Sequence, residues 1–241
     1  MGRRPTRLPA TRTVSDALVL RVVPYGEADA IVTYLTEELG KIAALGRGAR
    51  HSKRRLAGAL EPMHTHRITF DEKPNAELAT LVESHVLVPR FRLIASLDGM
   101  EAAGQAMRWI RSGSPWRTKE PAVWEELVSL LDRLDAAEPA PWAALAGTGL
   151  RLLFAFGYGL DFDACVRCGR ARPLEQSAYV DPAAGGVVCR ACGGALHKLD
   201  GARLARLSQA SRGEGALTAE DARIALPLVE EALASHADVE S

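Results

Sequence analysis

The chain has 241 residues, enough for two ordinary domains with a substantial buried core. Hydrophobic residues make up 47% and charged residues 25%, and 30 basic residues balance 30 acidic ones, as is typical of a soluble globular protein. No apolar run approaches the roughly 18 residues that a membrane span needs, and none follows the basic N-terminus as it does in a secretory signal. We therefore expect a cytoplasmic protein.

The N-terminal part of the chain has the pattern of short strands. Residues 1–13 are polar, basic and contain proline, so we expect a flexible basic arm there. Short apolar or alternating runs separated by turn residues then predict a small antiparallel barrel or sandwich over 14–88. The five expected strands cover 17–23, 30–35, 41–49, 63–71 and 77–88.

After Leu87–Phe91, where we place the domain boundary, the apolar residues recur at helical intervals. The sequence therefore predicts an α+β chain in which an all-helical domain fills residues 89–241. Pro227 lies inside the last helical segment and should break or kink it. The expected helices cover 91–111, 120–139, 141–156, 202–210 and 222–236.

The cysteines form two C-x2-C pairs with 20 residues between them. This spacing predicts a tetrahedral site for one structural Zn²⁺ with four thiolate ligands, in a module at about 160–197 that holds a hairpin at 178–189 to the helical domain. His197 is interpreted as a polar residue that follows the second pair. The alternative is two disulfides or a redox dithiol, which an oxidising compartment would favour. The expected ligands are Cys165, Cys168, Cys189 and Cys192.

A concentration of positive charge lies between two expected strands. Such loops commonly build the nucleic-acid groove of small barrels, and cations there attract phosphates without reading bases. A solvated loop made basic for solubility is the alternative. Only Tyr25, Tyr34 and Phe70 are aromatic before residue 90, so we expect binding mainly to the backbone, tolerant of sequence and sensitive to salt. The basic residues, with no Asp or Glu between them, are Lys41, Arg47, Arg50, Lys53, Arg54 and Arg55.

Common catalytic motifs are missing from the sequence. It contains no H-E-x-x-H of a metalloprotease, no G-x-x-x-x-G-K-[ST] of a nucleotide hydrolase and no G-x-S-x-G of an α/β-hydrolase. No histidine is followed two residues later by Glu, so the zinc deaminase pattern also fails. We expect a protein that is not an enzyme, with a zinc-dependent nuclease or hydrolase as a remaining alternative.

Two blocks of the sequence resemble the bacterial recombination mediator RecO family. Residues 17–50 and 53–62 are similar to its opening strands, basic loop and following turn, and residues 153–169 and 180–192 to its late helix and cysteine region. The resemblance implies an N-terminal OB-fold, a helical domain with an embedded zinc module, and no catalysis. The turn 24–29 resembles a family signature, in which Glu27 is expected to fix the loop or to pair with a nearby arginine.

The resemblance also implies a role in DNA repair and homologous recombination. Family members bind single- and double-stranded DNA, anneal complementary strands, and work with RecR to load RecA onto DNA coated by single-strand-binding protein, at the nucleoid during repair. The six basic residues look like the DNA-binding region. The alternative is a zinc-stabilised protein-interaction module with secondary DNA contact, in which a groove rimmed by Arg203, Arg206 and Arg212 accepts the acidic, hydrophobic tail of single-strand-binding protein.

Overall fold

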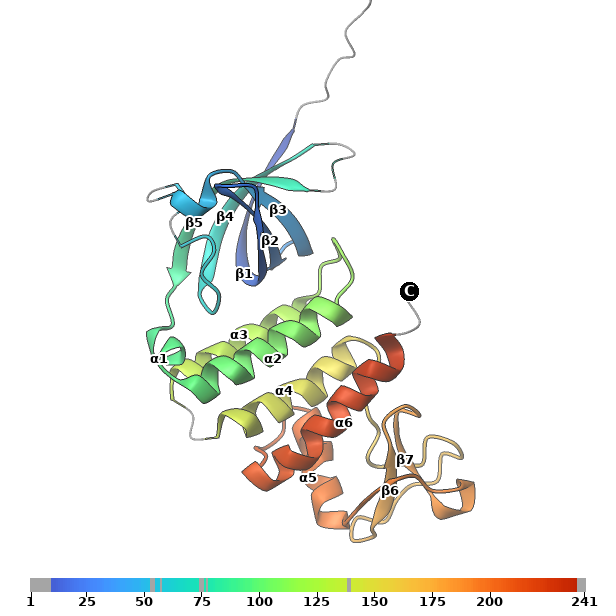
Figure 1. Cartoon of the computed structure of the whole chain (residues 1–241). Coiled ribbons are helices and arrows are strands. Elements are labelled where there is room, and N and C mark those ends of the chain that lie inside the picture. The colour runs from blue at the N-terminus through green and yellow to red at the C-terminus, as the bar shows by residue number, and fades with distance from the viewer. Residues whose placement is uncertain are drawn as a thin grey trace, which may run out of the picture. The chain divides into compact units, whose positions relative to one another are not determined.

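The computed structural model divides the chain into two compact units, each described here by itself (Figure 1). The barrel unit comprises residues up to Arg90 together with Ser114–Trp124. The helical unit comprises Phe91–Gly113 and the chain from Glu125 onward. The structure describes residues 10–52, 55–56, 58–73, 76, 78–137 and 140–237.

Five strands close the barrel in the order β1-β2-β3-β5-β4. The long first strand closes it because its first half pairs with β4 and its second half with β2, with an irregularity between Val19 and Arg21. β3 and β5 pair in parallel and the other neighbours pair antiparallel. This is the OB-type barrel that the sequence predicted. The strands are β1 (Thr11–Tyr25), β2 (Asp29–Thr36), β3 (Gly40–Gly46), β4 (Thr65–Glu72) and β5 (Ala79–Val88).

Alternating apolar side chains fill the barrel. Val32 and Tyr34 of β2 and Phe70 of β4 are fully buried. The Tyr34 hydroxyl donates a hydrogen bond to the carbonyl oxygen of Ala59 at 3.0 Å, so the polar end of this ring is satisfied inside the core. Two of the three aromatic residues before residue 90 therefore belong to the core.

The first strand begins earlier than the sequence analysis expected. Thr11–Thr13 pair with β4, and the Arg12 guanidinium donates to both carboxylate oxygens of Asp71 at 2.8 and 2.9 Å. This cross-strand ion pair and the Thr-Arg-Thr alternation hold the segment in the sheet. These residues were wrongly assigned to the flexible arm, of which residues 1–9 lie outside the described residues.

A segment that the sequence analysis assigned to the helical part belongs to the barrel unit. We call Ser114–Glu120 the strap. Trp116 of the strap forms a bridge with Lys41 at the start of β3. Gly40 has a φ of +66°, and a Cβ atom there would lie 1.7 Å from the carbonyl oxygen of Thr118. The strap can reach the barrel this closely only because residue 40 has no side chain.

The helical unit is organised around α4, which is buried along almost its whole length and contacts α2, α5 and α6. Pro141 occupies its first turn, where a missing N–H is tolerated. Helices occur in all the expected segments, but the first segment is divided into two helices, and the second expected helix ends at Asp135, short of the expected residue 139, with 138–139 outside the described residues. The helices are α1 (Phe91–Ile94), α2 (Leu97–Gly113), α3 (Pro121–Asp135), α4 (Pro141–Ala155), α5 (Gly201–Ser211) and α6 (Ala219–Ala237).

The last helix, α6, continues through Pro227, which the sequence analysis expected to break or kink it. A proline removes the hydrogen bond to the carbonyl of the residue four positions earlier, here Arg223. Both residues are exposed, so water can satisfy that carbonyl. The expectation of a break is wrong because the proline lies on the solvent-exposed side of an amphipathic helix.

The cysteine region contains a small sheet with the strand order β7-β6-β8. β6 (Ala178–Asp181) and β7 (Gly186–Val188) form the antiparallel hairpin expected at 178–189. β8 (His197–Leu199) pairs with the other edge of β6. The short 3-10 helix η2 (Arg190–Cys192) follows β7, with Cys189 directly before it and Cys192 as its last residue.

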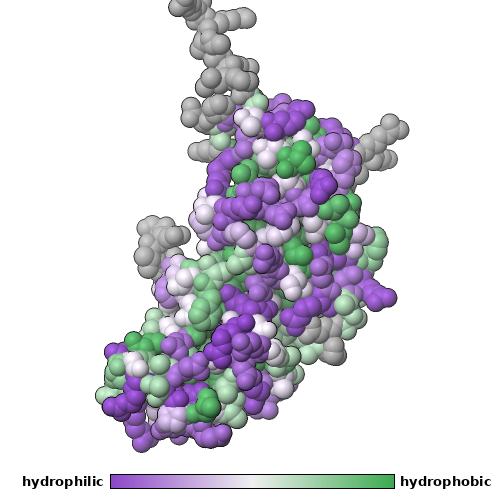
Figure 2. All heavy atoms as spheres, turned by 180° about the vertical axis from the view of Figure 1, so that it is seen from behind, coloured by the Kyte–Doolittle hydropathy of each residue, from purple (hydrophilic) through white to green (hydrophobic). Residues whose placement is uncertain are grey.

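On the face drawn in Figure 2, apolar side chains are scattered among hydrophilic ones. Within the described part of the chain, no helix is both long and apolar enough to cross a bilayer.

Candidate nucleic-acid interface and metal centre

The basic segment, residues 47–55, follows β3 and begins with a tight turn. Gly48 has a φ of +65°, and the short 3-10 helix η1 (Ala49–His51) follows it. The third strand thus ends before residue 49, its expected end. Arg47, Arg50 and Arg55 are exposed, whereas Lys53 and Arg54 lie outside the described residues.

The β1–β2 turn holds the basic segment in place. The backbone N–H of Arg50 donates to the carbonyl of Ala28 at 3.1 Å, and its Nη1 donates to the carbonyl of Glu27 at 3.0 Å. The N–H of Gly48 donates to Oδ1 of Asp29 at 2.7 Å. Glu27 therefore fixes the loop, as expected, but does so through its backbone carbonyl.

The three described arginines of the basic segment keep their positive charge uncompensated. Arg55 donates from Nη1 to the carbonyl of Val82 at 2.6 Å and from Nη2 to that of Arg47 at 3.3 Å, which fixes the side chain without neutralising it. No ion pair links any of the three to a carboxylate among the described residues. Arg12 and Arg67 on the same barrel instead pair with Asp71 and Asp16 at 2.8 Å.

Lys41 lies apart from the other cations. Its side chain is buried, and Nζ stands 4.7 Å from the centre of the Trp116 ring. Lys41 is the second residue of β3 and Arg47 follows the last, so the strand separates the two by about 20 Å. The structure therefore places Lys41 under the strap and not in the exposed basic segment.

One exposed aromatic ring accompanies the basic segment. Tyr25 ends β1 beside the turn that holds Arg50, and its side chain is 55% exposed. The sequence analysis counted this ring but had no means of placing it. Because Tyr34 and Phe70 are in the core, Tyr25 is the ring near these arginines that can stack with a base.

The four cysteines come together as the sequence predicted. Their sulfur atoms all lie within 4.8 Å of one another, and those of Cys168 and Cys189 are 3.8 Å apart. A zinc tetrahedron with metal–sulfur bonds of about 2.3 Å has sulfur–sulfur edges of about 3.8 Å. A disulfide requires about 2.05 Å. The cluster therefore has the dimensions of a metal centre and can hold one ion.

The surroundings of the cluster favour the thiolate form of one of its cysteines. The backbone N–H of Cys189 donates to Sγ of Cys165 at 3.3 Å, and this hydrogen bond, with others from Arg167 and Cys168, lowers the pKa of Cys165 to about 6. Hydrogen bonds with Cys189 and Cys168, together with burial and the nearby Cys165 thiolate, raise the pKa of Cys192 to about 12. Four thiolates at this spacing need a cation to offset their mutual repulsion, and a soft donor set of this kind fits zinc.

His197, as expected, is not part of the metal cluster. It lies on β8, and its Nε2 is 2.8 Å from a carboxylate oxygen of Glu231. The imidazole is therefore engaged by an acidic side chain of α6.

The three arginines proposed as the rim of a protein-binding groove are ion-paired within the helical unit. Arg206 donates to both oxygens of Asp221 at 2.9 and 2.7 Å, and Arg212 donates to Asp163 at 2.9 Å. Arg203 bonds to Glu220. Their charges are compensated, so the structure gives this groove no uncompensated basic rim.

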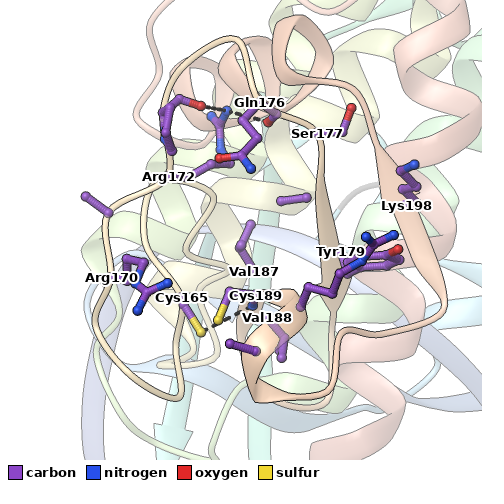
Figure 3. Close-up of a pocket in the computed structure, with 15 residues that line it drawn as sticks. Cys165, Arg170, Arg172, Gln176, Ser177, Tyr179, Val187, Val188, Cys189 and Lys198 are labelled. Atoms are coloured by element: carbon purple, nitrogen blue, oxygen red, sulfur yellow. Dashed lines mark hydrogen bonds between the residues drawn. The ribbon is translucent and has the colours of Figure 1, made fainter.

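A pocket of about 690 Å³ lies beside the cysteine cluster, with Cys165 and Cys189 at one end (Figure 3). Its cationic side chains were not singled out from the sequence. The local charge did not mark these side chains, because residues 161–200 hold five basic residues and five acidic ones. The four cations that line the pocket are Arg170, Arg172, Arg190 and Lys198.

Comparison with known proteins identifies both parts of the chain. The family model described as "Recombination protein O N terminal" matches residues 11–90, the barrel strands. The model described as "Recombination protein O C terminal" matches residues 110–240, including the cysteine cluster.

Similar proteins named DNA repair protein RecO cover about three quarters of the chain. That of Anaeromyxobacter sp. (strain K) is 38% identical over 181 residues, 75% of this chain and 70% of the relative. That of Myxococcus xanthus (strain DK1622) is 39% identical over 178 residues, 74% and 71% of the two chains. That of Geobacter sulfurreducens is 33% identical over 180 residues, which cover 74% of this chain and 72% of the relative.

Proposed function

Because the chain belongs to the RecO family of DNA repair and recombination proteins, we propose that it binds single- and double-stranded DNA and anneals complementary strands. It works with RecR in the cytoplasm, at the nucleoid, to load RecA onto DNA coated by single-strand-binding protein. The proposed activity is non-enzymatic. One observation carries the DNA-binding part, namely the exposed, uncompensated arginines at one end of an OB-type barrel.

The arginines are suited to hold a phosphate backbone. Guanidinium groups bind phosphate oxygens with two parallel hydrogen bonds, and Arg50 and Arg55 are already oriented by backbone carbonyls. Ordering them on DNA therefore costs less entropy than ordering free side chains. Contacts that go mainly to the backbone leave most base edges available, which is what pairing with a second strand requires.

The test is the affinity for single-stranded DNA as a function of salt concentration. In the variant Arg47→Gln/Arg50→Gln/Arg55→Gln we expect weaker binding, because three phosphate contacts are lost. The slope of the logarithm of affinity against the logarithm of salt should become shallower by about 2, since each contact contributes about 0.7 on a single strand. Glutamine removes the charge and keeps a polar side chain with an N–H donor.

The matched control is Arg12→Gln/Arg67→Gln on the same barrel. Both arginines are paired with aspartates, so their loss should leave the slope nearly unchanged. If the basic-segment variant and the parent had equal salt slopes, the segment would be a solvated loop that does not contact DNA. A parent protein that binds DNA but never accelerates annealing, even with single-strand-binding protein present, would refute the annealing proposal.

For the cysteine cluster we propose one structural zinc ion held by Cys165, Cys168, Cys189 and Cys192. Support comes from the four closely spaced sulfurs and from the amide that lowers the pKa of Cys165. A bound zinc ion would crosslink the two cysteine loops tetrahedrally and neutralise half of the thiolate charge. With four protein ligands it has no open position for catalysis.

A further inference from the structure

The pocket beside the cysteine cluster lies against one face of the small sheet. Its lining comes from the loop after the first cysteine pair, from β6, β7 and β8, and from η2. Tyr179 on β6 pairs directly with Lys198 on β8, so both side chains share that face of the sheet. Arg170 and Lys198 lie on opposite sides of the pocket (Figure 3).

The charge of this pocket is one-sided. Its lining includes four cationic side chains and no aspartate or glutamate, in a chain whose total charge is zero. A zinc ion with four thiolates would carry two negative charges, which leaves two positive charges uncompensated. A group that bears negative charge is therefore the expected occupant.

Two of the cations are fixed by neutral partners. Arg172 donates to the carbonyls of Phe162, Pro173, Leu174 and Gln176 at 2.7 to 3.2 Å, and its Nη2 is buried with no hydrogen-bond partner among the described residues. A hydrogen bond from Arg190 lowers the pKa of Tyr179. Arg170 and Lys198 are exposed, and no carboxylate pairs with either in the described part of the chain.

We propose that this pocket is a second nucleic-acid site, in which Arg170, Arg190 and Lys198 bind consecutive phosphates of a DNA strand. Gln176 and Ser177 lie beside the cations, and the exposed apolar residues of the lining are the small Ala171, Pro173 and Ala191. An acidic peptide would need a large apolar anchor site as well, and the lining valines Val187 and Val188 are buried.

A second site has a direct consequence for annealing. The basic segment lies on the barrel unit and the pocket on the helical unit, so one chain can hold two strands at once. Holding both strands converts their encounter into an event within one complex, which raises their effective concentration. The inference rests on the proposed function only in taking DNA as the polyanion.

The experiment compares two double variants of the full chain. Arg170→Ala/Lys198→Ala removes two charges from the pocket, and Arg92→Ala/Arg223→Ala removes two exposed charges elsewhere in the helical unit. For each we would count the short single strands bound per chain at saturation and measure the annealing rate. The control should bind one strand at the barrel and another at the pocket, as the parent does. The pocket variant should lose the second strand and anneal several-fold more slowly.

The outcomes separate the inference from the proposed function. A parent that binds no strand would refute both. A pocket variant that binds as many strands as the control would overturn this inference and leave the barrel site standing. If the pocket variant loses affinity for an oligoglutamate peptide, or for inorganic phosphate alone, with its strand count unchanged, the occupant is an acidic peptide or a small anion and the nucleic-acid assignment is wrong. Equal melting temperatures for the two variants would show that the loss is local.

Discussion

Asp221 is an acidic residue whose charge is buried and paired inside the helical unit. Its carboxylate is fully buried and accepts hydrogen bonds from Nε and Nη2 of Arg206. It also accepts hydrogen bonds from the backbone N–H and the hydroxyl of Thr218. The Thr218 hydroxyl oxygen in turn accepts a hydrogen bond from the backbone N–H of Asp221. This reciprocal pattern is a capping box at the start of α6. Together these interactions lower the pKa of Asp221 to about 2 against the opposing effect of burial.

We expect Asp221→Asn to destabilise the protein by about 2 kcal/mol near neutral pH, because the pKa is about two units below its ordinary value. A depressed folded-state pKa contributes stability that is present above the unfolded pKa. This stability is lost as the pH falls from about 4 to about 2. The unfolding free energies of parent and variant should therefore differ above pH 5 and converge in acid.

Denaturant melts at several pH values check this expectation. Asp98→Asn is the control, since Asp98 is an exposed carboxylate in the first turn of α2. Its effect should stay within a few tenths of a kcal/mol. A difference between parent and Asp221→Asn that is constant down to pH 2 would mean that packing, and not the ionised carboxylate, carries the loss.

Residue-level charge counting predicted where three exposed arginines lie, but not the surroundings of Lys41. Arg47, Arg50 and Arg55 are exposed as expected, because their sequence neighbourhood contains no acids. Lys41 was grouped with them, but the Trp116 that covers it comes from a distant part of the chain. A local count of charges contains no information about such a contact.

At the scale of elements, strands and cysteine pairs were predictable because their signals are local. Alternation, turn residues and C-x2-C spacing each act within a few residues. The strap was not predictable, because its place depends on the fit between Gly40 and Thr118 across the sequence. A lone glycine before a strand was interpreted as a break in the chain, whereas in the structure it also makes room for a neighbouring backbone.

We expect Gly40→Ala to destabilise the barrel unit by several kcal/mol, because the new methyl group would collide with the Thr118 carbonyl in addition to straining a left-handed backbone. Gly26→Ala is the matched control. Gly26 has a φ of +60°, but nothing lies within 4 Å of the position of its Cβ, so only the backbone strain of about 1–2 kcal/mol applies. Thermal or denaturant unfolding measures both.

The difference in stability between the two variants measures the effect of the close contact between Gly40 and the strap. Because both glycines have left-handed backbone, the excess loss in Gly40→Ala reports the close approach alone. In that variant Trp116 should also change its fluorescence in the folded state, since its ring is stacked on Lys41. Equal losses in the two variants would mean that the strap moves aside at little cost.

At the scale of the whole molecule, two units with separate cores should respond differently to loss of metal. The barrel core is built from residues of the barrel unit alone. The cysteine cluster lies in the helical unit, on the loops that flank β6 and β7. Since binding of a structural metal is part of the folding free energy, its removal should act on the unit that holds it.

We therefore expect a chelator to remove one zinc ion per chain, to lower the first thermal transition by several degrees and to expose the cysteine region to hydrogen exchange. Backbone amides of β6 and β7 should lose protection, whereas those of β2 should keep theirs. Cys165→Ser should behave like the chelated parent and respond no further to chelator, because its ligand set is incomplete. Hydrogen-exchange mass spectrometry with metal analysis measures each part.

If Cys165→Ser retained the metal and melted like the parent, the four-cysteine site would be refuted. If β2 lost protection together with β6, the two units would unfold as one cooperative structure, and the cysteine cluster would also stabilise the barrel.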